Sequence, residues 1–147
     1  MMRKILVDSD VVLDVATGRQ PFVEASQIAL SYFENSHAIG VLSAHSVTNI
    51  YYILRKLGSD PMACCFLRAI LEYLSIGAVD HKTIDSALES KFLDFEDGVQ
   101  HYCAINNQCD AILTRNINDY QFSEIQVMTP QEFIALYQSP EQEKTKG

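Results

Sequence analysis

The sequence contains no apolar run of the ~18 residues that a membrane-spanning helix requires, so no membrane segment is expected. Basic residues are scarce: eleven Lys and Arg stand against nineteen Asp and Glu, for a formal net charge of −8. Binding along a nucleic-acid backbone depends on Lys and Arg, so this balance argues against diffuse nucleic-acid binding. It still allows a nucleic-acid enzyme whose acidic site is loaded with metal cations.

No CxxC pair is present, and adjacent cysteines are poor disulfide partners, so a zinc site or a disulfide framework is not expected. We expect reduced, mostly buried thiols and a cytoplasmic protein. After Met-Met-Arg-Lys, only three apolar residues precede Asp8, which argues against a signal peptide at the start. The four cysteines are Cys64, Cys65, Cys103 and Cys109.

The chain of 147 residues also shows no internal repeat or linker, which favours one domain. Hydrophobic residues make up 48% and charged residues 20%, values that exclude a disordered or collagen-like chain. We expect a domain over residues 1–138. The last stretch, 139–147, has little apolar content and is expected to be frayed.

Short apolar runs alternate with segments of helical 3–4 periodicity. This alternation predicts an α/β fold with a central, mostly parallel sheet. The predicted strands are 5–7, 38–42, 76–79, 111–114 and 125–128. The predicted helices are 11–16, 22–33, 46–57, 60–74, 83–92, 97–106 and 129–137.

Several carboxylates fall where these strands end. Asp8 follows the first strand directly, Asp119 lies five residues after Thr114 at the end of the fourth, and Asp97 begins a helix. Ligands of parallel sheets gather at the carboxyl ends of the strands. Carboxylates held close together repel one another, and Mg²⁺ or Mn²⁺ relieves this by binding a few of them. Such sites hydrolyse phosphodiesters.

Each acid also has an ordinary interpretation. Asp8 and Asp119 suit turns or helix caps, Asp10 suits hydrogen bonding at a helix start, and Asp97 suits the positive end of a helix dipole. Asp14 is expected at an exposed helix position, since Asp is seldom buried. Asp94 and Glu96 are expected on a solvated helix entry.

Five ordered motifs resemble the PIN-domain family. They are Ile-Leu-Val-Asp8-Ser-Asp10-Val-Val-Leu-Asp14, the helix start at 43–52, the acidic segment 94–106, Thr114-Arg-Asn-Ile-Asn-Asp119-Tyr, and Met128-Thr-Pro-Gln-Glu-Phe133. The resemblance runs from Lys4 to about Leu136.

This resemblance implies a three-layer α/β/α sandwich and a metal-dependent ribonuclease. Asp8, Asp97 and Asp119 would be both catalytic and metal-binding, holding one or two Mg²⁺ or Mn²⁺ ions, with a 5′-phosphate product. Thr114 and Asn116 would shape the site by hydrogen bonding, with Asp10 as a further candidate. Many relatives are toxins of bacterial toxin–antitoxin pairs, the VapC-like group, so an antitoxin protein is an expected partner.

One position departs from the family pattern. The helix after the second strand usually carries a Glu where this chain has Asn49. An amide oxygen is a poorer Mg²⁺ ligand than a carboxylate, so metal affinity is expected to be weaker. Asp94 lies one helical turn before Asp97 and is expected to replace the missing charge in part.

An acidic enzyme needs a route for its RNA substrate. Arg55, Lys56 and Arg115 are the candidates for a basic patch, with Arg115 reaching a phosphate. The four histidines share no ligand spacing. Aromatic residues at helical spacing are expected in the core or in a homodimer. If Tyr51, Tyr52 or Phe66 is exposed, it would indicate a dimer or an antitoxin groove.

Three alternatives remain open at this stage. Asp8 and Asp10 also fit the opening of a haloacid-dehalogenase-like phosphatase, as nucleophile and general acid, although the Lys and late acidic pair of those enzymes are not found. A receiver-like phosphoacceptor domain lacks its Lys as well. Asn49 motivates the third alternative, a catalytically silent PIN-like interaction module.

Overall fold

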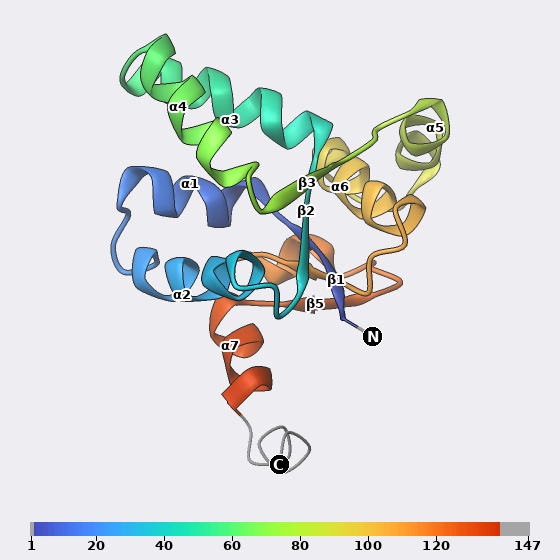
Figure 1. The fold of residues 1–147 in the computed structure, drawn as a ribbon. Coiled ribbons are helices and arrows are strands. Elements are labelled where there is room, and N and C mark those ends of the chain that lie inside the picture. The colour runs from blue at the N-terminus through green and yellow to red at the C-terminus, as the bar shows by residue number, and fades with distance from the viewer. Residues whose placement is uncertain (1, 139–147) are drawn as a thin grey trace.

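A computed structural model describes residues 2–138, and its centre is one sheet of five parallel strands (Figure 1). The strand order is β3-β2-β1-β4-β5, with every neighbouring pair parallel. The α/β architecture predicted from the sequence is confirmed. The strands are β1 (Lys4–Val7), β2 (Ile39–Ser43), β3 (Leu74–Gly77), β4 (Ala111–Leu113) and β5 (Gln126–Met128).

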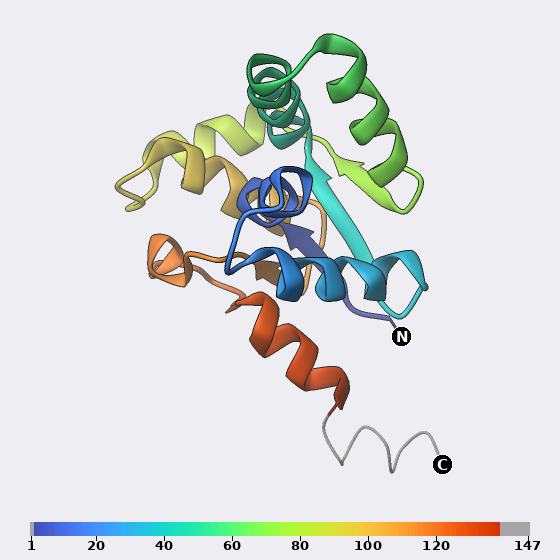
Figure 2. The same cartoon turned by 90° about the vertical axis from the view of Figure 1, so that its left-hand side faces the viewer.

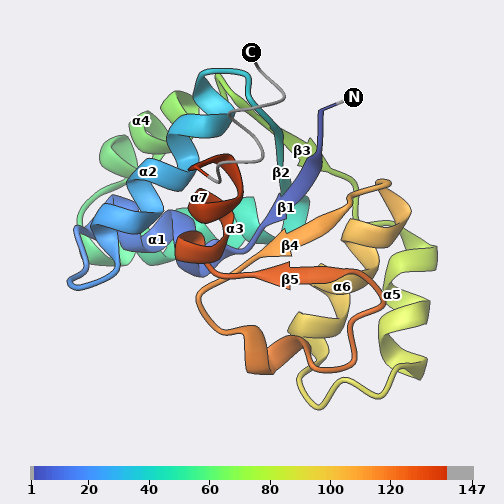
Figure 3. The same ribbon diagram turned by 90° about the horizontal axis from the view of Figure 1, so that it is seen from below.

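Helices cover both faces of the sheet, which makes the predicted three-layer sandwich (Figure 3). One layer contains α1 (Ser9–Thr17), α2 (Val23–Glu34), α3 (Ala44–Leu57), α4 (Asp60–Ile70) and α7 (Pro130–Gln138). The other contains α6 (Phe95–Asn106), with α5 (His81–Glu89) packed on it, and the 3-10 helix η1 (Ile117–Tyr120). In the first layer α2 and α7 lie side by side (Figure 2), where the rings of Phe33 and Phe133 stack at 5.4 Å.

The side chains of β1 point alternately to the two faces of the sheet, and a separate hydrophobic core lies on each face. Ile5 and Val7 point into the larger core beneath α1–α4 and α7, while Leu6 points into the smaller one beneath α6. All three side chains are completely buried. A strand covered on both faces must be apolar throughout, which is why the run before Asp8 is continuous rather than alternating.

Strand register brings the ends of β1 and β4 to one edge of the sheet. Val7 pairs with Leu113, and the amide of Asp8 donates to the Leu113 carbonyl oxygen at 2.9 Å. Thr114 continues the same edge through a 2.9 Å bond from its amide to the carbonyl oxygen of Met128. Asp8 and Thr114 therefore emerge next to one another.

The third strand lies two residues earlier than the sequence predicts. It begins at Leu74, which is buried and pairs with Gly40, whereas Ile76 is 54% exposed on this edge strand. Gly40 permits the pairing, because a Cβ there would collide with the Leu74 side chain. The helix predicted over 60–74 consequently ends at Ile70.

The end of α5 and the start of α6 also differ from the prediction. The helix predicted to end at 92 ends at Glu89, and α6 begins at Phe95 because Asp94 caps it, accepting a 2.8 Å bond from the Glu96 amide. The predicted frayed tail, 139–147, lies outside the described residues.

Burial of the thiols is only partly as expected. Cys103 and Cys109 are buried, and burial raises their pKa values to about 11 and about 12, so they are inert at neutral pH. Cys65, in contrast, is exposed and Cys64 is half-buried. Within residues 2–138, no helix has both the length and the apolar character needed to cross a membrane.

Candidate active site

Asp8 is the centre of a group of polar side chains from three elements. Its carboxylate accepts hydrogen bonds from the Tyr120 hydroxyl at 2.9 Å, from Thr114 Oγ1 at 3.0 Å and from Gln100 Nε2 at 3.3 Å. Asp8 occupies the N-cap position of α1, but its side chain makes no capping bond. Asp8 is thus the cap residue by position, but its carboxylate faces the edge of the sheet.

Asp10 lies beside Asp8, in the first turn of α1. Its Oδ2 atom accepts from Asn116 Nδ2 at 3.0 Å, Thr114 Oγ1 at 3.1 Å and the Arg115 amide at 3.2 Å. Its Oδ1 atom is buried without a hydrogen-bond partner. Such an oxygen is costly to bury unless a proton or a cation binds it.

Thr114 lies between the two carboxylates and cannot satisfy both. Its hydroxyl is within hydrogen-bond distance of Asp8 and of Asp10, yet a hydroxyl has one proton to donate. Burial raises the pKa of Asp8, although its three donors oppose this rise. Burial, and then the charge on Asp8, raise the pKa of Asp10 to about 7. The protein leaves negative charge here only partly compensated.

Asp97 and Asp119 extend this negative region. Asp97 lies in the first turn of α6 and Asp119 in η1, and both line a cavity of about 120 Å³ together with Asp94. Burial raises the pKa of Asp97 to about 7, with further contributions from the charges of Asp94, Asp119 and Asp8. Asp8 and Asp119 thus both lie within electrostatic range of Asp97.

The donor set fits a hydrated divalent cation better than a closed cage. Carboxylate oxygens are the hard ligands that Mg²⁺ and Mn²⁺ prefer, and Asp10 Oδ1 has no other partner. A bound cation would also relieve the repulsion among the charges which, together with burial, raise the pKa of Asp97. Among residues 2–138, however, no three His, Cys, Asp or Glu side chains converge closely enough to enclose an ion. Mg²⁺ is commonly held by one or two carboxylates and several waters, so this arrangement suits it.

Gln100 is the main residue of the site that sequence reasoning missed. It is buried, accepts from Ser43 Oγ, and donates to Ser46 Oγ at 2.9 Å as well as to Asp8. It thereby joins the start of α3 to the end of β1. Its position three residues after Asp97, on the same helix face, was the available signal.

Tyr120 was missed too, although it directly follows Asp119. Its ring is buried in the smaller core, which fixes the direction of its hydroxyl. Burial and the charge of Asp8 both raise the pKa of Tyr120, so it stays protonated and remains a donor.

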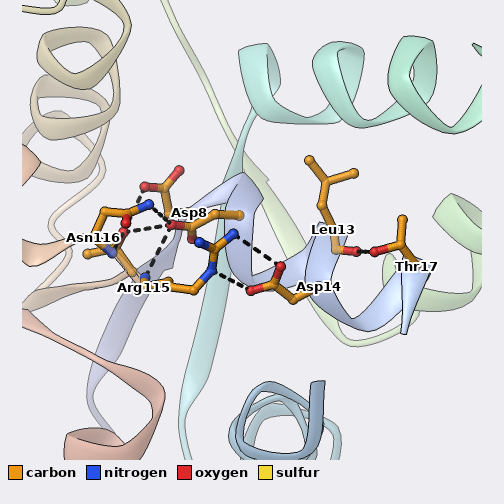
Figure 4. Close-up of polar contacts among 8 residues, drawn as sticks. Asp8, Leu13, Asp14, Thr17, Arg115 and Asn116 are labelled. Atoms are coloured by element: carbon orange, nitrogen blue, oxygen red, sulfur yellow. Dashed lines mark hydrogen bonds and ion pairs between the residues drawn. The ribbon is translucent and has the colours of Figure 1, made fainter. Parts of the chain in front are cut away.

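Arg115 binds Asp14 rather than extending toward a substrate (Figure 4). Its Nε and Nη2 atoms donate to the two carboxylate oxygens of Asp14 at 2.7 and 3.2 Å. The guanidinium also lies 4.3 Å from the centre of the Phe22 ring. Asp14 is 1% exposed, so its predicted surface position is wrong; pairing with Arg115 is what makes the burial possible.

The remaining predicted residues lie further from Asp8 or play other parts. Asn49 is half-buried in α3, one turn beyond Ser46. Arg55 and Lys56 lie in the last turn of α3, at the opposite end from Ser46, so they do not form a patch at Asp8.

Tyr52 is exposed, while Tyr51 and Phe66 are half-buried against the larger core. A dimer or antitoxin surface there stays a prediction.

Comparisons with known proteins agree with this architecture. The sequence matches the family model of the PIN domain over residues 4–118. A toxin–antitoxin complex from Klebsiella pneumoniae contains a similar chain, with a TM-score of 0.65 at 19% identity, covering 86% of this chain and 97% of that one. For VapBC2 from Rickettsia felis, bound to a promoter DNA fragment, the TM-score is 0.66 at 11% identity, covering 86% and 98%.

VapC20 from Mycobacterium tuberculosis, a toxin that cleaves the sarcin-ricin loop, gives a TM-score of 0.58 at 10% identity, covering 74% of this chain and 86% of that one. At these identities the solved structures establish the fold alone. No curated protein matches the sequence. Since the family match spans most of the chain, the chain belongs to the PIN-domain family.

Proposed function

We propose that this protein is a metal-dependent ribonuclease that hydrolyses RNA phosphodiester bonds with Asp8, Asp97 and Asp119. The observation that carries the proposal is that Asp97 lies within electrostatic range of both Asp8 and Asp119, from separate segments, and that burial and then the charges of the neighbouring acids raise its pKa to about 7. Membership in the PIN-domain family supports the same chemistry.

The residues of the chain have distinct parts in this proposal. Gln100, Thr114 and Tyr120 hold the Asp8 carboxylate in a fixed orientation. Asp97 and Asp119 line the cavity in which a phosphate and its cation would be held. When bound, Mg²⁺ or Mn²⁺ supplies Lewis-acid stabilisation of charge on the phosphate oxygens and acidifies the attacking water.

Asn49 favours one second candidate, a silent PIN-like interaction module. A neutral amide at this position removes a negative charge, so we expect weak metal binding. Asp94 lines the acidic cavity, but one of its oxygens caps α6, which limits how far it can substitute. The phosphatase alternative loses support, because the family model of the PIN domain matches residues 4–118.

The decisive variant is Asp8→Asn, with Asp85→Asn, an exposed acid on α5, as the matched control. We expect Asp8→Asn to abolish Mn²⁺-dependent cleavage of single-stranded RNA while the fold is retained, and Asp85→Asn to leave cleavage unchanged. Cleavage by Asp8→Asn at the wild-type rate would refute the proposal.

Metal binding itself has a readout that does not need activity. An ion that binds only the folded protein raises its melting temperature, so millimolar Mn²⁺ should stabilise the wild type and not Asp8→Asn. No stabilisation and no titration heat with Mn²⁺ would favour the silent module.

We further propose that the ribonuclease is the toxin of a toxin–antitoxin pair. The similarity to chains of toxin–antitoxin complexes from Klebsiella pneumoniae and Rickettsia felis supports this. Expression of the wild type should arrest bacterial growth, and expression of Asp8→Asn should not. Equal growth with both would contradict a toxic ribonuclease.

A further inference from the structure

A second hollow lies against the acidic cavity and shares a wall with it. Phe122, just after η1, lines both the acidic cavity and a neighbouring hollow of about 410 Å³. That volume falls in the range of roughly 300–1,000 Å³ occupied by small-molecule sites. Figure 3 shows η1 and the loop after α5 side by side at this end of the molecule. The hollow is lined by Glu89, Ser90, Lys91, Phe92, Tyr102, Phe122 and Glu124.

The aromatic rings of this hollow pack against one another and against a buried histidine. The Phe92 ring lies 5.0 Å from the ring of buried His101 and 6.2 Å from Phe122, nearly perpendicular to it at 77°. Tyr102 packs edge-on against His101 at 4.7 Å. Phe122 remains 45% exposed. The rings are thus pre-positioned, which lowers the entropy lost when a ligand stacks on them.

The same aromatic group connects to the acidic site. Phe92 lies 6.3 Å from the ring of Tyr120, whose hydroxyl bonds Asp8. A ligand group stacked on Phe122 would therefore be separated from the cavity lined by Asp97 and Asp119 only by the Phe122 side chain.

We propose that the aromatic hollow binds an unpaired nucleobase of the RNA, adjacent to the phosphodiester held in the acidic cavity; this rests on the proposed ribonuclease function. Bases stack on aromatic side chains in single-stranded nucleic-acid sites whatever their sequence. The hollow is lined by one lysine and two glutamates, so its net charge is negative. A negative hollow accommodates an uncharged base more readily than a phosphate group. Base-paired RNA cannot offer an unstacked base, so the substrate class is single-stranded RNA.

A tryptophan reporter tests the stacking directly, because the chain contains no tryptophan. Phe122→Trp places an indole in the shared wall, and Tyr52→Trp places one on α3, at a residue of similar exposure outside the hollow. With oligouridylate added in Mg²⁺, we expect the Phe122→Trp fluorescence to be quenched with saturation and the Tyr52→Trp fluorescence to be unchanged. Equal quenching of both reporters, or of neither, would overturn the proposal.

Phe122→Ala tests the energetic contribution. Loss of one stacked base corresponds to about a 5- to 150-fold weaker affinity for single-stranded RNA, measured by anisotropy on protein that circular dichroism shows to be folded. Unchanged affinity would overturn the proposal, while cleavage that persists in Phe122→Ala would leave the ribonuclease function standing. Quenching by RNA without cleavage by the wild type would leave the base site standing and refute the nuclease. If Phe122→Ala instead dissociates a dimer in size-exclusion chromatography, the hollow is a protein interface and the base site is wrong.

Discussion

Replacing Arg115 with methionine is expected to destabilise the protein by about 3–5 kcal/mol, because it leaves a buried carboxylate unpaired. Asp14 is 1% exposed, and within residues 2–138 Arg115 is the one side chain that bonds its carboxylate. Loss of the contact between the guanidinium and Phe22 adds about 0.5–1 kcal/mol. Domains of this kind are stable by ~5–15 kcal/mol, so the change removes a large part of the total.

A double variant separates the buried charge from the packing. Asp14→Leu combined with Arg115→Met replaces the ion pair with apolar groups of similar total volume and leaves no charge buried. Such replacements are often neutral or stabilising, so we expect the double variant to lie within about 1 kcal/mol of the wild type. The two single changes should therefore be strongly non-additive.

Urea unfolding followed by circular dichroism measures these differences, with Arg68→Met, an exposed arginine on α4, as the control. The reasoning would be refuted if Arg115→Met cost less than about 1 kcal/mol, or if the double variant were as unstable as Arg115→Met. If Arg115 instead binds a phosphate, the stable double variant should lose RNA affinity and show a salt-dependence slope reduced by about 1.

Three further changes probe the site and the sheet. Burial raises the pKa of Asp10 from 3.8 to about 7, so its ionisation lowers the free energy of unfolding progressively from about pH 4 to 7. Asp10→Asn should remove this loss and raise the free energy of unfolding by about 1–2 kcal/mol at about pH 8. Parallel profiles of melting temperature against pH for the wild type and the variant would contradict this. Tyr120→Phe removes a donor to the Asp8 carboxylate and should lower the free energy of unfolding by about 1.5–3 kcal/mol in urea; a change below about 0.5 kcal/mol would show that the bond contributes little. Gly40→Ala forces a Cβ against Leu74 and should cost about 1–3 kcal/mol by the same assay, whereas unchanged stability would mean that the edge strand moves freely.

The sequence was sufficient to predict the sheet and the position of Asp8, for a physical reason. A parallel strand buried on both faces must be continuously apolar, so Ile5–Val7 is recognisable, and the first polar residue after it marks the edge of the sheet. Thr114 follows β4 in the same way. Asp119 was expected at the same edge because it follows the fourth strand, and Asp97 on the condition that its helix begins there.

Side-chain direction and pairing could not be predicted in this way. Gln100 differs from other polar helix residues only in facing Ser46 and Asp8, which depends on the packing of α6 against the sheet. Asp14 is expected at the surface until its partner is known, and Arg115 lies 101 positions away in the sequence. The third strand was misplaced because exposed Ile76 suggests a core position that an edge strand does not provide.

Charge compensation in the site supports a cation-dependent function more strongly than the motifs do. Asp8 is bonded by neutral donors, among them Gln100, Thr114 and Tyr120, and in the described part of the chain no guanidinium or ammonium group hydrogen-bonds it or Asp10. The nearest available cation, Arg115, contributes its backbone amide to Asp10 but directs its guanidinium to Asp14. A site whose only task was structural would gain stability by pairing that guanidinium with the crowded acids, since such pairing lowers the pKa of a carboxyl group. Because the guanidinium bonds Asp14, its charge only partly offsets the charges of Asp10 and Asp8, and the remaining negative potential is what the divalent ion of the proposed function would relieve.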